Sequence, residues 1–509
     1  MKLIKKIAAI MFAFMMVVSM SCNVKADDTN TATTGEKGTI TINNAIPGQT
    51  YKIYKVLELE SYNPTTKNYA YKVTSEWKNF VDGDGSTYLT KVDGTDYVNW
   101  VGDSSNNGEH VKTFAEKAIA YAKDVNNNIN PLQTNENVTS NTVTFNNLPL
   151  GYYLVDSSVG TLCSLDTTKP AATIQEKNGV PSVDKIITSG GVVFNGGKSN
   201  SANIGDKVYF KTTITTQPGA QNYVLHDKMT EGLTFDENSV NVSLHKKATS
   251  DEKTLTKTKD YSVDTTNLES TGPKCTFHIN FTKELCDGLK ADDTITVTYS
   301  ATLNENAVIA GKGYENETWL KYGDSQNTQH KTTTTKAFEM KVFKFYIDKN
   351  DSNTEKGLAG ATFKLTKDSQ DVVNIGFVKT SNETDTDDVY RVAKRGETGT
   401  VATITSPKSG KFTIQGLGAG TYYLTETKQP DGYNKLSGPV TVVIDKDGQV
   451  KVKNGDAYDE VTQVKVENKS GTVLPSTGGM GTTMIYLVGA VLVLGSGVVL
   501  ATKRRVKNK

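Results

Sequence analysis

Residues 145–156 read FNNLPLGYYLVD, and residues 414–426 read IQGLGAGTYYLTE. Each stretch places a glycine-containing turn before a run that is rich in tyrosine and leucine and closes on an acid, Asp156 or Glu426. A turn followed by such a run predicts a β-strand. Because the same arrangement occurs early and late in the chain, we expect the first and the last domain to be related β-sandwiches.

The rest of the 509-residue chain favours the same fold class. Residues 294–299 alternate as half-buried strands do, and long helical patterns are few. One short amphipathic helix is expected at residues 111–123, with Phe114, Ala118 and Tyr121 on one face. The formal net charge of +1 gives no reason to expect a nucleic-acid partner. The sequence therefore predicts a mainly β protein built from tandem immunoglobulin-like sandwiches.

Both ends of the chain carry segments that lie outside these sandwiches. Lys2, Lys5 and Lys6 precede an apolar stretch at residues 7–20, as in a secretory signal peptide. Near the other end, the apolar residues 480–501 could cross a membrane as a helix, with the basic tail on the cytoplasmic side. The expected organisation is a signal peptide at 1–26, domains at 27–180, 181–335 and 336–470, and a C-terminal signal with one transmembrane helix at 471–509.

A pentapeptide stands directly before the apolar C-terminal stretch. Its residues are Leu474, Pro475, Ser476, Thr477 and Gly478. The pattern L-P-x-T-G, followed by an apolar run and a basic tail, resembles the cell-wall sorting signal of Gram-positive bacteria. The resemblance implies that a membrane transpeptidase, a sortase, cuts between Thr477 and Gly478 and transfers the threonine acyl group to an amine. The alternative is an ordinary membrane anchor with a chance pentapeptide.

The expected third domain contains a lysine, an acid and an asparagine in a suggestive order. Lys344 lies on its first strand, Glu426 in a Tyr-x-Leu-x-Glu segment, and Asn468 on its last strand. These motifs resemble the B-type repeat of collagen adhesins, which implies a spontaneous bond between the lysine amine and the asparagine side chain. Burial lowers the pKa of an amine and raises that of a carboxyl group, so the amine becomes a nucleophile and the acid can move protons.

The expected second domain resembles a pilin module that forms a similar bond with a different topology. The matching residues are Lys185, Asp227 and Asn316, and Lys207 is a rival for Lys185. In both domains, the alternative is an exposed lysine, a solvated acid and a turn asparagine. The first domain differs, because residues 39–42 contain no lysine and Asp156 takes the expected place of Glu426. We therefore predict no internal bond there.

Together, these parts resemble the major (backbone) pilins of sortase-assembled Gram-positive pili. In that family a lysine near the end of the first domain attacks the acyl-sortase and so joins one subunit to the next. Lys177, followed by Asn178, is our candidate, although the Tyr-Pro that often precedes this pair is absent; Lys169 is the nearest lysine upstream. The partners implied are other copies of the chain, minor pilins, a pilus-specific sortase, a housekeeping sortase and peptidoglycan.

The sequence contains no recognisable enzyme motif. The five histidines show no metal-ligand spacing, and no phosphate loop or serine elbow is present, so we expect neither a cofactor nor a metal and no enzymatic activity beyond the internal bonds. After processing, Cys163, Cys275 and Cys286 remain, and Cys275 with Cys286 is the nearest possible disulfide. A wall-anchored adhesin or minor pilin is the alternative function, and a surface hydrolase has almost no support.

Overall fold

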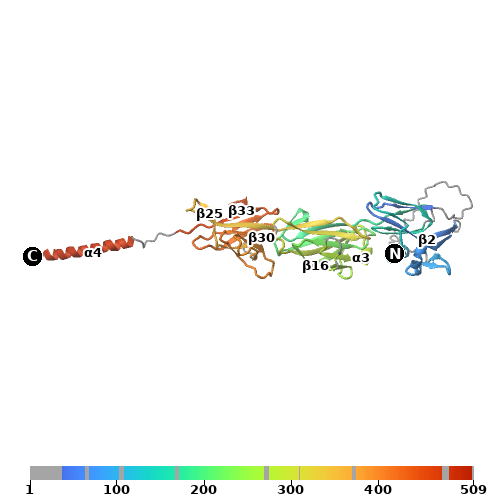
Figure 1. Ribbon diagram of the computed structural model, residues 1–509, viewed down its shortest axis with the longest axis horizontal. Coiled ribbons are helices and arrows are strands. Elements are labelled where there is room, and N and C mark those ends of the chain that lie inside the picture. The colour runs from blue at the N-terminus through green and yellow to red at the C-terminus, as the bar shows by residue number, and fades with distance from the viewer. Residues whose placement is uncertain are drawn as a thin grey trace.

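The computed structural model describes most of the chain in the order that the sequence predicts. Three β-rich parts follow one another in an elongated row and lead to an isolated C-terminal helix (Figure 1). The described residues are 37–63, 68–101, 108–166, 171–219, 221–266, 268, 274–308, 310–369, 374–472 and 481–506. The expected signal peptide and the pentapeptide at 474–478 lie outside this part of the chain.

The first sandwich contains a three-stranded sheet in the order β10-β1-β7 and a seven-stranded sheet in the order β4-β5-β3-β2-β8-β9, with β6 pairing β2. Its strands are β1 (Lys37–Asn43), β2 (Tyr51–Asn63), β3 (Asn68–Val73), β4 (Leu89–Lys91), β5 (Tyr97–Trp100), β6 (Gln133–Asn135), β7 (Thr142–Pro149), β8 (Gly151–Ser157), β9 (Gly160–Asp166) and β10 (Ala171–Gln175). Its helices are α1 (Lys78–Asp82) and α2 (Gly108–Lys123).

Helix α2 corresponds to the predicted amphipathic helix and begins three residues earlier, at Gly108. Phe114 and Ala118 are fully buried, and Phe114 packs against Phe80 with ring centroids 5.9 Å apart. Tyr121 contacts Trp77, at 6.2 Å between the ring centroids. The predicted face therefore covers an aromatic cluster on one side of the larger sheet, and the helix is held mainly by this burial.

The second sandwich contains a five-stranded sheet in the order β11-β14-β20-β16-β17 and an eight-stranded sheet in the order β12-β13-β23-β21-β15-β19-β18, with β22 pairing β21. The strands are β11 (Ser182–Ser189), β12 (Val192–Phe194), β13 (Ser199–Ser201), β14 (Lys207–Thr215), β15 (Val224–Met229), β16 (Leu233–Lys246), β17 (Asp251–Thr254), β18 (Tyr261–Asp264), β19 (Phe277–Phe281), β20 (Thr294–Leu303), β21 (Gly313–Tyr322), β22 (Gln326–Asn327) and β23 (Lys331–Lys336). Its short helix is α3 (Lys283–Asp287).

The third sandwich is built from two six-stranded sheets. One has the order β25-β24-β30-β28-β27, with β35 pairing β24, and the other has the order β29-β26-β31-β32-β33-β34. The strands are β24 (Phe338–Asp348), β25 (Thr354–Gly357), β26 (Thr362–Lys367), β27 (Phe377–Lys379), β28 (Asp388–Val392), β29 (Ile404–Thr405), β30 (Lys411–Leu417), β31 (Gly420–Lys428), β32 (Val440–Ile444), β33 (Val450–Asn454), β34 (Ala457–Glu460) and β35 (Val464–Glu467).

The first and third sandwiches share the arrangement that the repeated sequence predicts. In the first, strand β1 lies between β10, which runs parallel to it, and β7, which runs antiparallel. In the third, β24 makes the same parallel pairing with β35 and the same antiparallel pairing with β30. In both turns a tyrosine hydroxyl donates to the carbonyl four residues earlier, from Tyr153 to Pro149 and from Tyr422 to Gly418. The mainly β, tandem-sandwich fold class is confirmed.

The junctions between the sandwiches differ in their packing. The buried apolar residues of the second and third sandwiches form one continuous core, and Val159 of the first sandwich also packs into it. At their boundary, Asn203 Oδ1 accepts hydrogen bonds from the backbone N–H of Gly418, at 2.7 Å, and from the hydroxyl of Tyr422, at 2.9 Å. Between the first and second sandwiches, Lys123 Nζ instead bridges Asp156, at 3.0 Å, and the half-exposed Asp324, at 2.6 Å.

Helix α4 (Gly481–Val506) is the C-terminal element of the described chain. Its residues Met484–Arg504 have a mean hydropathy of 2.4 and are long and apolar enough to cross a membrane. The helix stands apart from the sandwiches, and its apolar side chains are exposed (Figure 1). One C-terminal apolar helix is therefore present where the sequence predicts it.

Candidate functional sites: two buried lysine clusters

The third sandwich brings Lys344, Glu426 and Asn468 together in its core. Lys344 lies on β24, Glu426 on β31, and Asn468 directly after β35, and each side chain is at most 2% exposed. The parallel pairing of β24 with β35 places Lys344 opposite Val466, so the lysine of the first strand comes beside the end of the last strand. The sequence therefore selects three residues that are neighbours in space.

Contacts within this cluster connect all three side chains. Lys344 Nζ donates to Asn468 Oδ1 and also to the Val466 carbonyl at 3.2 Å. Asn468 Nδ2 donates to Glu426 Oε1 at 2.9 Å, and the same Oε1 lies 3.8 Å from Lys344 Nζ. The second carboxylate oxygen accepts from the backbone N–H of Leu436 at 2.8 Å. Burial lowers the pKa of Lys344 to about 8, and the attraction of Glu426 offsets only part of this effect.

The second sandwich has a comparable cluster. Lys185 on β11, Asp227 on β15 and Asn316 on β21 are fully buried. Lys185 Nζ lies 2.6 Å from Asp227 Oδ2. Burial lowers the pKa of Lys185 and raises the pKa of Asp227, each against the attraction of the other. Both shifts favour the uncharged forms, an amine and a carboxylic acid.

Tyr299 on β20 is a fourth member of this cluster that the sequence analysis did not select. Its hydroxyl accepts from Lys185 Nζ and donates to Asp227 Oδ2. It also accepts from Asn316 Nδ2 at 3.2 Å, so it connects the amine and the acid to the amide. Tyr299 belongs to the alternating run at residues 294–299, where it reads as an ordinary core residue. Only its side-chain contact with Lys185, across the intervening strand β14, distinguishes it.

The rival lysine of the second domain lies outside the core. Lys207 is exposed and forms an ion pair with Asp236 at 2.8 Å on the surface. An amine in water keeps its proton at neutral pH, which removes its nucleophilic lone pair. The described geometry therefore favours Lys185 over Lys207.

The first sandwich has different residues at the corresponding positions. Ile42 pairs Ile174 as Val342 pairs Val464, so the exposed Asn44, two residues further on, corresponds to Lys344. The expectation that Asp156 takes the place of Glu426 was wrong.

A difference of one residue explains this correction. The shared tyrosine contact aligns Tyr153 with Tyr422, so Ser157 corresponds to Glu426. Asp156 is one position earlier and faces the opposite side of the sheet, because successive side chains of a strand alternate. There it binds Lys123, and burial raises its pKa to about 6.

Lys177, the expected acceptor, is exposed and lies two residues after the end of β10. Its neighbour Glu176 is buried, accepts from the backbone N–H of Asn178 at 2.8 Å, and has a pKa raised by burial. The adjacent backbone is further fixed by a hydrogen bond from the N–H of Gly179 to the Pro218 carbonyl at 3.1 Å. Lys177 is thus presented to solvent at the junction of the first two sandwiches, whereas Lys169 lies outside the described residues.

The candidate disulfide does not form between Cys275 and Cys286. Both are buried thiols. Cys286 lies on α3, and burial raises the pKa of its thiol to about 11. Cys275 instead lies close to His226, at 3.6 Å between Sγ and Nδ1.

Comparison with known families assigns three parts of the chain. Residues 204–326 match the family described as Gram-positive pilin backbone subunit 2, Cna-B-like domain. Residues 343–457 match the SpaA family, a prealbumin-like fold domain, and residues 466–509 match the LPXTG cell wall anchor motif. The anchor match includes the pentapeptide at residues 474–478.

Individual proteins resemble the chain more distantly. The T6 backbone pilin of serotype M6 Streptococcus pyogenes is 17% identical, with a TM-score of 0.50 over 86% of this chain and 100% of that one. The full-length major pilin SpaD of Corynebacterium diphtheriae is 16% identical, with a TM-score of 0.43 over 87% of this chain and 99% of that one. Fimbrial subunit type 1 of Actinomyces viscosus is 38% identical over 86 residues, which are 16% of this chain and only 15% of that protein.

The fold and the matched segments define a wall-anchored surface protein of tandem pilin-type β-sandwiches. More particularly, a domain of the Gram-positive pilin backbone family and a SpaA-type prealbumin-like domain precede an LPXTG cell-wall anchor in this chain.

Proposed function

We propose that the chain is the shaft subunit of a covalently polymerised surface pilus, with internal bonds that brace its second and third domains. The observation that carries the proposal is the contact of Lys344 Nζ with the side-chain oxygen of Asn468, inside the core and between the first and last strands of one sandwich. A structural tie at this position suits a protein that is pulled from its ends. We do not propose an enzymatic activity on other molecules.

Formation of the internal bond is a condensation within the chain. The neutral amine of Lys344 attacks the side-chain carbonyl carbon of Asn468, the new C–N bond forms, and the C–N bond to the amide nitrogen breaks. Ammonia leaves with the proton that the lysine nitrogen gives up, and Glu426 carries protons between the two nitrogens. Because the reacting groups are already in contact within one molecule, the entropic part of the activation barrier is much smaller than for two separate molecules. Lys185, Asp227 and Asn316 perform the same reaction in the second domain.

Polymerisation would use the two ends of the folded part. A pilus-specific sortase cuts between Thr477 and Gly478, and the amine of Lys177 of another copy attacks the resulting acyl-enzyme. A housekeeping sortase attaches the finished polymer to peptidoglycan, and minor pilins complete it. We further propose that the subunit is organised as a signal peptide at 1–26, three domains at 27–180, 181–335 and 336–470, and a sorting signal at 471–509.

The test is made on cell-wall extracts that are boiled in SDS and probed for this protein. The variants are Lys177→Ala and a matched control, Lys259→Ala, which removes another exposed lysine. We expect a high-mass ladder in wild type and in the control, and monomer only in Lys177→Ala. A ladder that survives in Lys177→Ala would move the acceptor to another lysine. A wild-type extract without a ladder would contradict the shaft function and favour a wall-anchored adhesin or minor pilin.

A further inference from the structure

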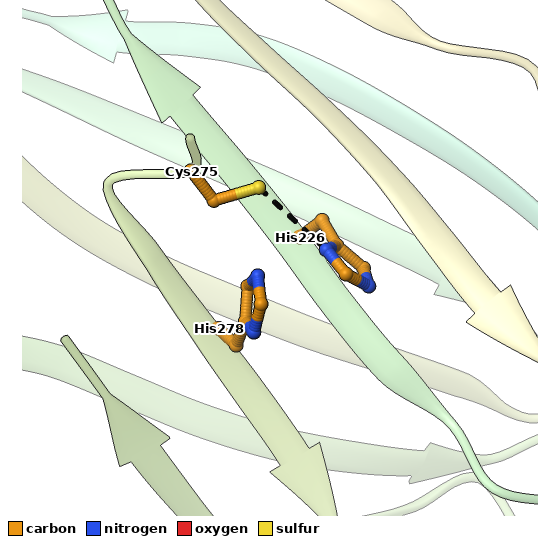
Figure 2. Close-up of side chains that lie close together, drawn as sticks. All are labelled: His226, Cys275 and His278. Atoms are coloured by element: carbon orange, nitrogen blue, oxygen red, sulfur yellow. Dashed lines mark hydrogen bonds between the residues drawn. The ribbon is translucent and has the colours of Figure 1, made fainter. Parts of the chain in front are cut away.

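Two histidines and a cysteine meet on one sheet of the second sandwich, away from the lysine cluster. His226 on β15 and His278 on β19 are directly opposite each other in an antiparallel pair, and Cys275 lies two residues before β19. Successive side chains of a strand alternate, so His226 faces the side of the sheet opposite to its neighbour Asp227. Figure 2 shows the three side chains converging. The cluster is therefore separate from the cross-link chemistry.

The cluster is compact and shielded from water. Its potential ligand atoms, one from each residue, all lie within 4.8 Å of one another. His226 is 3% exposed, His278 5% and Cys275 9%. Cross-strand neighbours such as the two histidines are held at a fixed short separation by the backbone pairing, so little side-chain entropy remains to be lost when a ligand binds them.

One ligand-to-ligand distance already matches a tetrahedral zinc ion. Sulfur and nitrogen ligands at about 2.3 Å and about 2.1 Å from zinc are about 3.6 Å apart at the tetrahedral angle. Cys275 Sγ and His226 Nδ1 are separated by 3.6 Å. Two nitrogen ligands of one zinc ion lie about 3.4 Å apart. Because all three ligand atoms lie within 4.8 Å of one another, a side-chain shift of at most about 1.4 Å brings His278 into the same coordination sphere.

The donor set has the chemistry of a zinc site. Imidazole nitrogen and thiolate sulfur are the ligands that Zn²⁺ prefers, whereas Ca²⁺ and Mg²⁺ select oxygen. Binding converts the Cys275 thiol to a thiolate and releases one proton to solvent. One thiolate against a divalent ion leaves a single net positive charge. Three protein ligands leave a fourth position for water.

Neighbouring side chains extend the cluster on both sides. The indole ring of Trp319 stacks on His226, with centroids 4.9 Å apart and ring planes 10° from parallel. The strand register places Asp264 opposite His278 on the other edge. A carboxylate beside a ligating histidine commonly fixes the orientation of its ring. The sequence spacing does not reveal this cluster, because pairing between strands brings its members together.

We propose that His226, Cys275 and His278 form a binding site for one Zn²⁺ ion in the second domain. The ion joins strand β15 to the segment that enters β19 and so fastens this edge of the domain independently of the lysine cross-link. Because the site adds a contact present only in the folded state, Zn²⁺ binding stabilises the second domain.

The experiment uses the full chain in detergent, stripped with a chelator and titrated first with Co²⁺ and then with Zn²⁺. We expect visible bands of tetrahedral Co²⁺, a near-ultraviolet thiolate-to-cobalt charge-transfer band, quenching of Trp319 fluorescence, and displacement of these signals by Zn²⁺. After dialysis, the zinc content should be about one ion per chain, and the unfolding midpoint should rise.

Cys275→Ser tests the assignment, and Cys286→Ser is the matched control because it changes another buried thiol of the same domain. Cys275→Ser should lose the charge-transfer band and at least about ten-fold in zinc affinity, while Cys286→Ser keeps both. If Cys275→Ser does not fold, the zinc affinity of His278→Gln and the presence of the charge-transfer band in wild type still test whether this cluster binds the ion. Wild-type protein without that band, equal zinc binding by Cys275→Ser, or binding of Cu⁺ without Zn²⁺ would overturn the proposal.

Discussion

The lysine clusters of the second and third sandwiches contain the same residue types in different relations. In the third, the amine of Lys344 contacts the amide of Asn468, and Glu426 binds the other side of that amide at 2.9 Å. In the second, the amine of Lys185 contacts the acid at 2.6 Å, and Asn316 is connected to them through the Tyr299 hydroxyl. One cluster has its nucleophile placed at the amide, and the other has its proton-transfer pair in contact.

This difference separates two requirements of the reaction. Deep burial is common to both sites and suppresses the charge on each lysine. The position of the acid relative to the amine and the amide differs between the two sites. If both clusters form the proposed bond, the acid acts from behind the amide in one and from beside the amine in the other, and in each a hydrogen-bonded path reaches the third group.

The largest expected effect is the loss of either cross-link. Asn468→Ala and Asn316→Ala each remove the side-chain amide that the lysine would attack. After allowing for the substitution, the intact mass of each variant should show the loss of one ammonia fewer than in wild type. Lys344 and Asn468 are 124 residues apart, and a tie that closes a loop of this size contributes about 5 kcal/mol to stability. Thermal unfolding of the affected domain should therefore begin on the order of 15 °C earlier. A mass difference between wild type and variant that equals the Asn-to-Ala substitution alone, together with equal proteolysis, would show that the domain carries no bond.

The next effect is on the rate and concerns the acids. Asp227→Asn and Glu426→Gln keep the shape of the side chain but remove its ability to carry protons, and we expect each to slow bond formation at least about a hundred-fold. The rate is followed by mass spectrometry on freshly synthesised chain. Each substitution should leave the bond in the other domain unchanged, and a change in both domains would indicate a general folding defect instead.

Tyr299→Phe sharpens the contrast because only the second site has this bridge. We expect bond formation in the second domain to slow about ten-fold, with the third domain unaffected. Tyr322→Phe is the matched control, since Tyr322 is a tyrosine of the same domain that is 2% exposed and not part of the cluster. If the two variants behave alike, the Tyr299 hydroxyl has no part in positioning Asn316.

The smallest expected effect is a pH dependence of the stability of the third domain when its internal cross-link is absent. In Asn468→Ala, Lys344 stays unreacted, with a pKa near 8 when folded against 10.5 when unfolded. Between these values the unfolded state binds more protons, so stability is lowest below about pH 8 and rises as the pH increases toward 10.5. Thermal unfolding across this range measures the effect. Lys344→Met in the same background removes the titrating group, and its pH profile should be flat there.

Much of the fold and of both sites was predictable because their signals are local. The turn and strand motif at residues 414–426 predicts the strand that carries Glu426, whereas the resemblance to the B-type repeat of collagen adhesins selects Lys344, Glu426 and Asn468 as a set. Tyr299 was missed because the sequence of an alternating strand does not show which side chains its tyrosine will contact in the folded sandwich. The misplacement of Asp156 came from a single residue, since one extra position after a turn moves a side chain to the other face of a sheet.

Lys177 lies after the last strand of the first sandwich, and this position has a mechanical consequence. With Lys177 as the acceptor, tension enters each subunit at the junction before the second sandwich and leaves at Thr477. The load path then runs through the second and third sandwiches alone, and within the residues that the structure describes these are the two with a buried lysine cluster. With this acceptor, the first sandwich lies outside the load path and bears no tension. It is then available as a spacer or as a docking surface.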